Sequence, residues 1–414
     1  MSDQPHRPHD SVTLTRRDLV AGTAAAIGLA VLGRGALAQA AAPPGPSRAP
    51  GGPATPLGAR APHERPRRVV GGMNREISLT PLQDLRGIVT PSDLHYERHH
   101  AGVPVIDPGA YKLLIHGMVD RPTVFDLQAL QRFPAVSRFH FLECSGNGES
   151  AYRGMRPDQS PQDVDGLTST SEWTGVALST LMREVGVHPR ATWFLAEGGD
   201  AALMARSIPV EKGRDDAMIA YGQNGEALRP EQGYPARLLL PGWEGNTNVK
   251  WIRRIEFADR PFMTRDETSK YTDPLPNGTA RIFSFVMDAK SVITFPAYPA
   301  KLTDAGWWDI IGLAWSGRGR IAGVDVSTDG GRTWSPAALE QPVLPKCHTR
   351  FSLPWKWNGR DALLMSRATD ETGYIQPTLA QLRAARGSGT RYHFNHIRAW
   401  RVQPDGAVVF GLEG

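Results

Sequence analysis

The sequence has only two cysteines among its 414 residues, Cys144 and Cys347. Two thiols are too few for a disulfide framework, a zinc site of four cysteines or an iron–sulfur cluster. A Cys-x-x-Cys-His motif is also missing, so we expect no c-type haem on this chain. The sequence further lacks Gly-x-Gly-x-x-Gly and Walker patterns, and a doubly wound nucleotide-binding fold is therefore not expected.

Neither positive nor negative charge is in large excess, since the sequence has 47 basic and 42 acidic residues and a net charge of +5. This excess is too small and too dispersed for a nucleic-acid-binding protein. Apolar residues make up 40% of the chain and charged residues 21%, values that argue against a disordered or fibrous protein. At roughly 100–200 residues per domain, the length predicts two or three domains.

The apolar run near the N-terminus, residues 19–32, is too short for a transmembrane helix. The pair Arg16-Arg17 precedes it and Ala36-Leu37-Ala38 follows it as a small-residue cleavage site. This order is typical of a twin-arginine export signal, a route that carries folded proteins, often with a cofactor already inserted. An ordinary secretion signal with incidental arginines is the alternative. We predict an export signal at 1–38, a periplasmic protein, and no membrane span once the signal is removed.

After the signal, residues 39–69 are rich in proline, glycine and alanine without an apolar period, which predicts a flexible linker. Residues 70–278 mix helix and strand signals. Helices are predicted at 126–133, which opens with an acidic N-cap, and at 176–187, where apolar residues recur at helical spacing. The segments 191–198 and 236–242 are typical of short buried strands.

From residue 279 to 414 the pattern changes to short alternating strands with no long helical periods. Asp329-Gly330-Gly331 indicates a hairpin turn, and segments such as FSLPWKW, ALLMSRATD, HFNHIRAWRV and AVVFGLE are typical of further strands. The predicted fold class is α+β, with a mixed α/β domain at 70–278 followed by an Ig-like β-sandwich at 279–414.

Cys144 follows a strand-like segment and precedes a tight polar turn, Ser145-Gly146-Asn147-Gly148. Three roles are open to such a cysteine: a buried structural thiol, a nucleophile beside a base, or a ligand of a soft metal. For Cys347 we expect a structural role. Alternation predicts two faces for the strand, with Phe139, Phe141 and Glu143 on one and His140, Leu142 and Cys144 on the other.

The segment SRFHFLECSGNG resembles the molybdenum-ligating cysteine segment of the sulfite oxidase family of molybdopterin oxidoreductases. The similarity extends over about residues 75–410, and two segments, 95–104 and 260–278, most resemble the sulfane dehydrogenase branch of this family. Further segments are similar to the family in the same order: HYERHH (95–100), LTSTSEWTGVAL (167–178), the stretch 219–255 ending in VKWIRRI, and the sandwich segments 314–334 and 354–357.

This resemblance implies a molybdenum cofactor bound through molybdopterin, with Cys144 as the thiolate ligand of the metal. It also implies an active-site arginine, Arg98, near the substrate oxygens, and an active-site tyrosine, Tyr271. Further residues are implied to contact the pterin or its phosphate: His99, His100, Arg237, Lys250 and Arg254.

The sequence also departs from the pattern of sulfite oxidases. Gln232 stands where the family often has a pterin-contacting histidine, and Gly148-Glu149 replaces an arginine pair that helps to bind sulfite. Losing two positive charges weakens a site for a small dianion, because charge attraction in a partly dry cleft is strong. Arg153 or Arg156 remain as substitutes for the missing pair.

The resemblance therefore implies a periplasmic sulfane dehydrogenase subunit that oxidises reduced sulfur on a carrier protein during thiosulfate oxidation. Because the chain has no haem motif, the electrons are expected to leave to a separate c-type cytochrome subunit. A homodimer through the C-terminal domain is implied as well. The alternatives are a free-sulfite dehydrogenase with the same cofactor and a secreted, non-catalytic β-sandwich binding protein.

Overall fold

The computed structural model describes residues 45, 50–74, 76–275 and 277–411. The chain divides into two compact units, 1–60 and 61–414. The predicted export signal lies outside the described residues, and residues 50–60 contain no helix or strand. Within the described part of the chain, none of the helices combines the length and the apolar character that crossing a bilayer requires.

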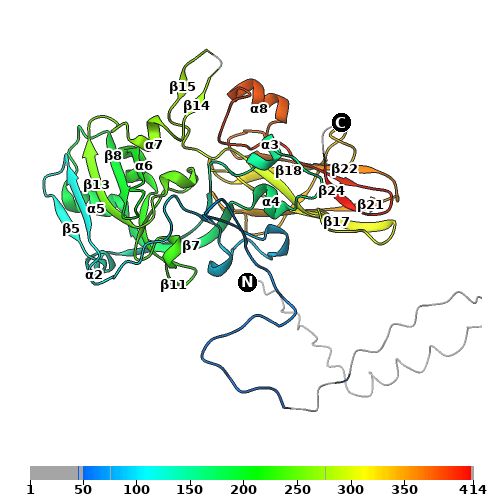
Figure 1. Ribbon diagram of the computed structural model, residues 1–414, viewed down its shortest axis with the longest axis horizontal. Helices are drawn as coiled ribbons and strands as arrows, with labels where there is room; N and C mark the ends of the chain where they lie inside the picture. Colours follow the sequence, from blue (N-terminus) through cyan, green and yellow to red (C-terminus); the bar gives the residue numbers. More distant parts are fainter. Residues whose placement is uncertain (1–44, 46–49, 75, 276, 412–414) are drawn as a thin grey trace, which may run out of the picture. The chain divides into compact units, whose positions relative to one another are not determined.

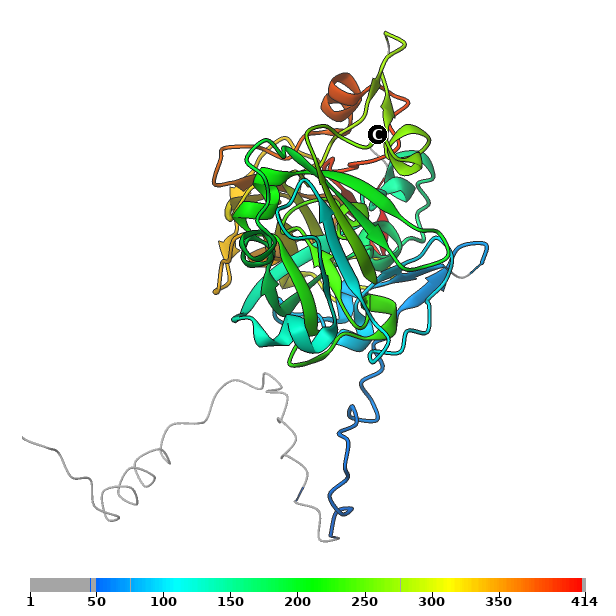
Figure 2. The ribbon, with the colours of Figure 1, turned by 90° about the vertical axis from the view of Figure 1, so that its left-hand side faces the viewer.

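Three sheets form the part of the larger unit that precedes the sandwich. β4 and β13 pair in parallel and the other neighbouring strands pair antiparallel. The first sheet has the strand order β5-β4-β13-β8-β9, and Figure 2 shows these strands side by side in cyan and green. Their bounds are β4 (Leu113–Gly117), β5 (Thr123–Phe125), β8 (Trp193–Gly198), β9 (Ala205–Pro209) and β13 (Ile252–Ala258). The second has the order β11-β10-β7-β6, with β12 beside β10: β6 (Ala135–Glu143), β7 (Thr168–Ala177), β10 (Met218–Gln223), β11 (Glu226–Ala227) and β12 (Arg237–Leu239). The third contains β1 (Val69–Gly71), β2 (Ile77–Leu79) and β3 (Glu97–Arg98).

Both predicted helices are present. Asp126 caps the first one, because its carboxylate accepts a hydrogen bond of 2.8 Å from the amide of Ala129. The second buries Leu178, Leu181, Met182 and Val185 in the core to which both of these five-stranded sheets contribute, and ends at Gly186 in the left-handed conformation. The helices of the described chain are α2 (Leu127–Arg132), α3 (Glu149–Arg153), α4 (Pro161–Asp165), α5 (Leu178–Val185), α6 (Val210–Asp215), α7 (Arg265–Thr268) and α8 (Leu379–Arg386).

Two antiparallel sheets face each other in the C-terminal part and enclose a core of side chains such as Ile310, Phe351, Leu364 and Trp400. The predicted fold class, a mixed domain followed by a β-sandwich, is confirmed (Figure 1). One sheet contains β16 (Lys290–Phe295), β17 (Gly306–Trp315), β20 (Ala338–Leu339) and β21 (Thr349–Trp357). The other contains β18 (Ile321–Ser327), β19 (Ser335–Pro336), β22 (Ala362–Asp370), β23 (Ala399–Val402) and β24 (Val408–Phe410).

Two predictions of secondary structure in this region were wrong. A helix, α8, forms at 379–386 although no helical period was expected there; its N-cap Thr378 and Gln381 make a reciprocal capping box. The segment 393–398 was expected to be a strand, but it is irregular and buried. Its backbone carbonyls bind side chains instead of a neighbouring strand: Arg398 donates to Phe394 and Gln376 to His396.

The predicted domain boundary at 278 lies in the turn of a short hairpin, β14 (Asp273–Pro274) and β15 (Ala280–Arg281), which projects at the top of Figure 1. The alternation predicted for β6 is confirmed. Phe141 packs against Trp315 of the sandwich, whereas Leu142 on the opposite face packs against Tyr96 and Trp173. The end of β6, and Cys144 directly after it, therefore lie between the two domains.

Candidate active site

A cavity opens where the end of β6, the loop after β12 and the region around β3 meet. Together with its open mouth it contains about 670 Å³ not filled by protein atoms. Seven of the eight residues with a predicted role line it: Arg98, His99, His100, Cys144, Arg237, Lys250 and Tyr271. Further lining residues are His95, Tyr96, Leu142, Asp200, Met204, Gln232, Gly245, Asn246, Asn248, Val249 and Trp251.

Cys144 is presented by a turn that follows β6 directly. Its amide donates to the carbonyl of Leu167 and its carbonyl accepts from the amide of Asn147, at 3.0 and 2.9 Å. The side chain of Asn147 stabilises this turn, because it donates a hydrogen bond to the carboxylate of Glu143 and accepts one from the amide of Leu167. Burial raises the pKa of the Cys144 thiol, while nearby Arg98 acts in the opposite direction. A bound metal cation favours the deprotonated thiolate.

A buried network of charges supports this turn from the sandwich side. The ammonium of Lys290, on β16, lies 2.6 Å from the carboxylate of Glu143 and 3.5 Å from that of Asp165. Arg398 forms a second ion pair with Asp165 at 3.0 Å. The indole of Trp315 donates to Glu143 at 2.7 Å. These charges are almost fully buried, so two carboxylates and two cations from both domains hold the end of β6 together.

Gly148 lies against this network and not in the cavity. A Cβ atom there would overlap the guanidinium of Arg398 and lie 2.9 Å from the carbonyl oxygen of Phe394. Its φ of +92° is also a conformation that favours glycine. No arginine side chain fits at this position. Neither substitute reaches the cavity: Arg153 donates to the carbonyl of Thr390, and Arg156 pairs with Asp158 at the surface.

We therefore expect Gly148→Ala to lower the free energy of unfolding by about 2–5 kcal/mol. The left-handed backbone accounts for about 1–2 kcal/mol of this, and overpacking against Arg398 for about 1–3 kcal/mol. Gly225→Ala is the matched control, because Gly225 has a φ of +80° with nothing within 4 Å of the added Cβ. Urea unfolding measures both variants. Equal losses would show that Arg398 moves away at little cost.

The segment from β3 to His100 brings three predicted residues to the cavity wall. His99 is held on both ring nitrogens, at 2.7 Å from a carboxylate oxygen of Glu97 and 2.9 Å from the ammonium of Lys250. Lys250 also donates to the carbonyls of Arg98 and Glu231. Burial lowers the pKa of Lys250 to about 7, with Arg237 adding to the effect. An anionic group in the cavity would favour the protonated amine.

Tyr271 reaches the cavity from the loop between α7 and β14. Its hydroxyl lies 2.8 Å from Nε2 of His100, whose pKa burial lowers to about 4. For Tyr271, burial has the opposite effect and raises the pKa of the hydroxyl, and the nearby Cys144 raises it further. The tyrosine is therefore neutral and can donate a hydrogen bond at physiological pH. His100, being neutral, can accept one.

The two remaining predicted arginines differ in position. Arg237 is buried under the cavity, where its guanidinium donates to the carbonyls of Gln232 and Asn248 and lies 5.2 Å from the ring centroid of Trp173. Arg254 is not among the residues that line the cavity. On β13 it binds the carboxylates of Glu197 and Glu256, each at 2.7 Å. Each of its two terminal nitrogens thus donates to a carboxylate.

The chemistry of the wall fits an anionic, polar cofactor with a soft metal. Four buried polar atoms of the wall have no hydrogen-bond partner among the described residues: Nε2 of His95, Oδ1 of Asp200, Nε of Arg237 and Oδ1 of Asn246. Three cationic side chains and one carboxylate line the space. A pterin offers the ring donors and acceptors that satisfy such atoms. Among the residues that line the cavity, Cys144 is the one that carries a thiol.

Sequence reasoning did not single out several wall residues. Asn246 and Asn248 lie in the GNTNVK stretch that the resemblance already covered, so closer reading of that stretch would have found them. Asp200 and Met204 follow a glycine turn after β8 and carry no local signal. Two residues behind the wall, Tyr392 and His393, come from the sandwich, about 250 residues after Cys144 in the sequence, and only tertiary structure brings them near.

Comparison with known proteins agrees with this geometry. A family model described as an oxidoreductase molybdopterin binding domain matches residues 100–265, and one described as a Mo-co oxidoreductase dimerisation domain matches residues 281–399. The crystal structure of the sulfane dehydrogenase SoxCD from Paracoccus pantotrophus is similar with a TM-score of 0.81 and 46% identity. The match covers 84% of this chain and 91% of that one.

Among curated proteins, mitochondrial sulfite oxidase of Drosophila melanogaster is 31% identical over 70% of this chain and 55% of its own length. The inducible nitrate reductase 2 of Glycine max is 31% identical over 66% of this chain and 34% of its own. The chain thus spans about half, or about a third, of the length of these relatives.

Fold and cavity together define a molybdopterin-dependent oxidoreductase. More particularly, the chain belongs to the sulfite oxidase family, and it is similar to a sulfane dehydrogenase over most of its length.

Proposed function

We propose that this protein is the molybdenum subunit of a sulfane dehydrogenase, which oxidises reduced sulfur presented on a carrier protein. One observation carries the proposal: the thiol of Cys144 opens into a cationic cavity whose wall also contains Arg98 and Tyr271. When bound, molybdopterin with its metal supplies a two-electron transfer of an oxygen atom to sulfur. Cys144 would hold the metal, and Arg237, Lys250 and His99 the pterin and its phosphate.

The residues of this chain act on the charge that develops during the reaction. Arg98 presents a guanidinium that stabilises negative charge on the oxygens of the product, from a fixed position and without reorganisation. Tyr271 donates a hydrogen bond to the same oxygens, and His100 accepts from its hydroxyl when the site is empty of substrate. The mostly buried wall limits water, which strengthens each of these interactions.

The wall favours carrier-bound sulfur over free sulfite. Gly148 has no room for a side chain, and both Arg153 and Arg156 are engaged elsewhere. Beyond the cations already in its wall, the cavity therefore lacks the pair of extra positive charges that would balance the charge of a small dianion such as sulfite. Sulfur on a carrier arm presents less charge and gains affinity from contacts outside the cavity.

Electrons would leave to a separate c-type cytochrome, since the sequence contains no haem-attachment motif. The similarity to the SoxCD structure and the match to a dimerisation domain support a complex with such a subunit and a homodimer. The export signal predicted at 1–38 supports a periplasmic location for this reaction. The free-sulfite dehydrogenase remains the second candidate because its cofactor and fold are shared.

Steady-state kinetics with metal analysis test the proposal. We expect protein exported from a molybdenum-competent host to contain about one molybdenum per chain and to oxidise a protein persulfide with a c-type cytochrome as acceptor. Sulfite should be a poor substrate. We expect its kcat/KM to be below about 10² M⁻¹s⁻¹, which is about 100-fold under the lower end of the 10⁴–10⁸ M⁻¹s⁻¹ range of typical enzymes. A micromolar KM for sulfite with a high kcat would instead establish the sulfite dehydrogenase. Absence of molybdenum would favour the non-catalytic binding protein.

A further inference from the structure

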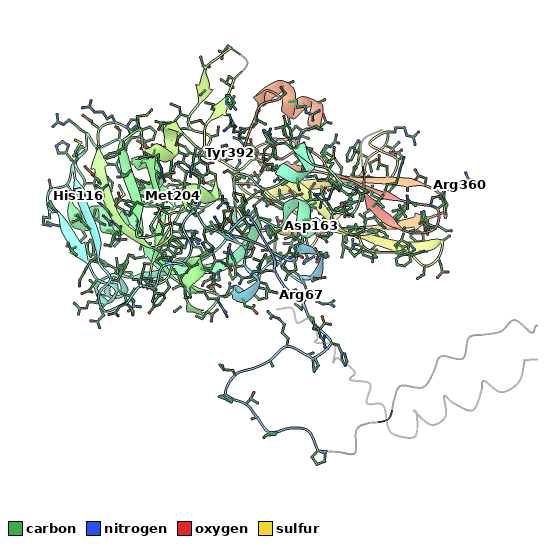
Figure 3. The ribbon with its side chains drawn as sticks, in the orientation of Figure 1. Arg67, His116, Asp163, Met204, Arg360 and Tyr392 are labelled. Carbon is green, nitrogen blue, oxygen red and sulfur yellow. The ribbon has the colours of Figure 1, made fainter. Side chains whose placement is uncertain are left out.

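A short segment of the sandwich domain, Thr390–His393, reaches the back of the cavity. It lies between α8 and β23, and Figure 3 shows Tyr392 where the sandwich meets the catalytic domain. Thr390 and His393 are buried and Tyr392 is half-buried, whereas Arg391 is exposed. Apart from that arginine, the segment lies mostly inside the junction.

One end of this segment is fastened to the loop that carries Tyr271. The backbone amide of Tyr271 donates to the hydroxyl of Tyr392 at 3.2 Å. Two residues along the loop, the buried carboxylate of Asp273 accepts from the hydroxyl of Thr390 and from the amide of Arg391, at 3.0 and 3.1 Å. Three hydrogen bonds thus join two loops that belong to different domains.

The other end of the segment is fastened to the turn that carries Cys144. The amide of His393 donates to the carbonyl of Ser145, the next residue after the cysteine, at 2.7 Å. The imidazole of His393 lies 3.3 Å from the carboxylate of Glu244, which also pairs with Arg206 at 3.2 Å. Adjacent residues of one segment therefore contact both sides of the cavity.

The conformation of Tyr271 needs such support. Its φ of +45° lies in the left-handed region, which a bulky residue adopts only where the surrounding structure holds it. The Tyr271 ring packs near the ring of Tyr392, at 5.3 Å between centroids, and near the guanidinium of Arg206, which is 5.1 Å from the Tyr271 centroid. Tyr392 thus contacts both the backbone and the ring of Tyr271.

We propose that Tyr392 is a positioning residue, which sets the direction of the Tyr271 hydroxyl toward the cavity. The inference rests on the proposed function, because it assigns Tyr392 an effect on catalysis only through Tyr271. Through the amide of His393, the same segment also fixes where that hydroxyl lies relative to Cys144.

Tyr392→Phe tests this directly, since it keeps the ring and removes the hydroxyl that accepts from the Tyr271 amide. We expect the variant to keep its molybdenum content and KM, and its kcat to fall about 10-fold through misorientation of one group. Hydrogen–deuterium exchange at the Tyr271 amide should become at least about 5-fold faster, because its acceptor is gone. In a Tyr271→Phe background, Tyr392→Phe should lower kcat no further.

Tyr374→Phe is the matched control. Its hydroxyl also accepts one hydrogen bond in the sandwich domain, from the side chain of Asn395 at 3.2 Å, and it is not among the contacts of Tyr271. We expect unchanged kcat and unchanged exchange at Tyr271. The same losses in both variants would show a general loosening of the sandwich and overturn the inference.

Two further results would also overturn it: unchanged exchange at the Tyr271 amide in Tyr392→Phe, or effects of the two substitutions on kcat that multiply. Failure of the proposed function is distinguishable, because it appears in the unsubstituted protein as efficient oxidation of free sulfite, as absence of molybdenum, or as no oxidation of protein persulfide. The exchange measurement does not require turnover and decides the inference in that case.

Discussion

Replacing Cys144 by serine is expected to abolish turnover while leaving the fold intact. Serine is nearly the same size, but its hydroxyl stays protonated and its oxygen is a poor ligand for a soft metal. Since even losing a partner of a metal ligand typically costs 10–100-fold in activity, we expect a loss of more than about 100-fold. Activity per bound molybdenum is the measurement, and far-ultraviolet circular dichroism should be unchanged.

Cys347→Ser is the matched control for this experiment. The Cys347 thiol is buried and donates to the carbonyl of Phe139 at 2.8 Å, a bond that a serine hydroxyl can replace. It is not among the residues that line the cavity. We expect nearly full activity from this variant. A Cys144→Ser protein with activity close to the original would show that the metal is not held through this thiol.

The second large effect is expected at Lys290, whose ammonium neutralises the buried carboxylates under the cysteine turn. Lys290→Met leaves Glu143 and Asp165 with only one cation, Arg398, between them. Breaking a buried ion pair from one side typically costs about 3–5 kcal/mol in the free energy of unfolding. Urea unfolding, followed by tryptophan fluorescence, measures the loss.

Lys301→Met is the corresponding control, because Lys301 pairs with Asp405 on the surface of the same domain at 3.7 Å. Exposed pairs of this kind contribute about 0–1 kcal/mol. Similar losses in both variants would mean that water or a movement of Arg398 compensates the buried carboxylates. We also expect Lys290→Met to retain less molybdenum, since Glu143 and Asn147 support the turn from which Cys144 projects.

The sequence was informative wherever the determinants are local. The acidic N-cap at Asp126, the apolar period of α5 and the alternation along β6 each predicted an element or a face that the structure has. Such patterns depend on neighbouring residues alone, so they can be recognised without knowing the tertiary structure.

What the sequence did not predict depends on distant contacts. The segment around His396 was expected to be a strand, but it is irregular, and buried side chains bind its backbone carbonyl instead. Arg254 carries the same charge as Arg237, but its guanidinium pairs with Glu197 and Glu256, whereas Arg237 lines the cavity. The contribution of Tyr392 has no local signal at all.

The site behind Cys144 is completed by residues that the ribosome adds late. When the turn after β6 emerges from the exit tunnel, Lys290 has not been synthesised, and His393 and Arg398 follow about 100 residues after that. Until then Glu143 and Asp165 lack these counter-charges, and the carbonyl of Ser145 lacks the amide of His393. The residues that line the cavity lie between His95 and Tyr271, but the turn that carries Cys144 has its full support only after Arg398 has been added, so a metal held through this thiol would be held firmly only once the sandwich has been made.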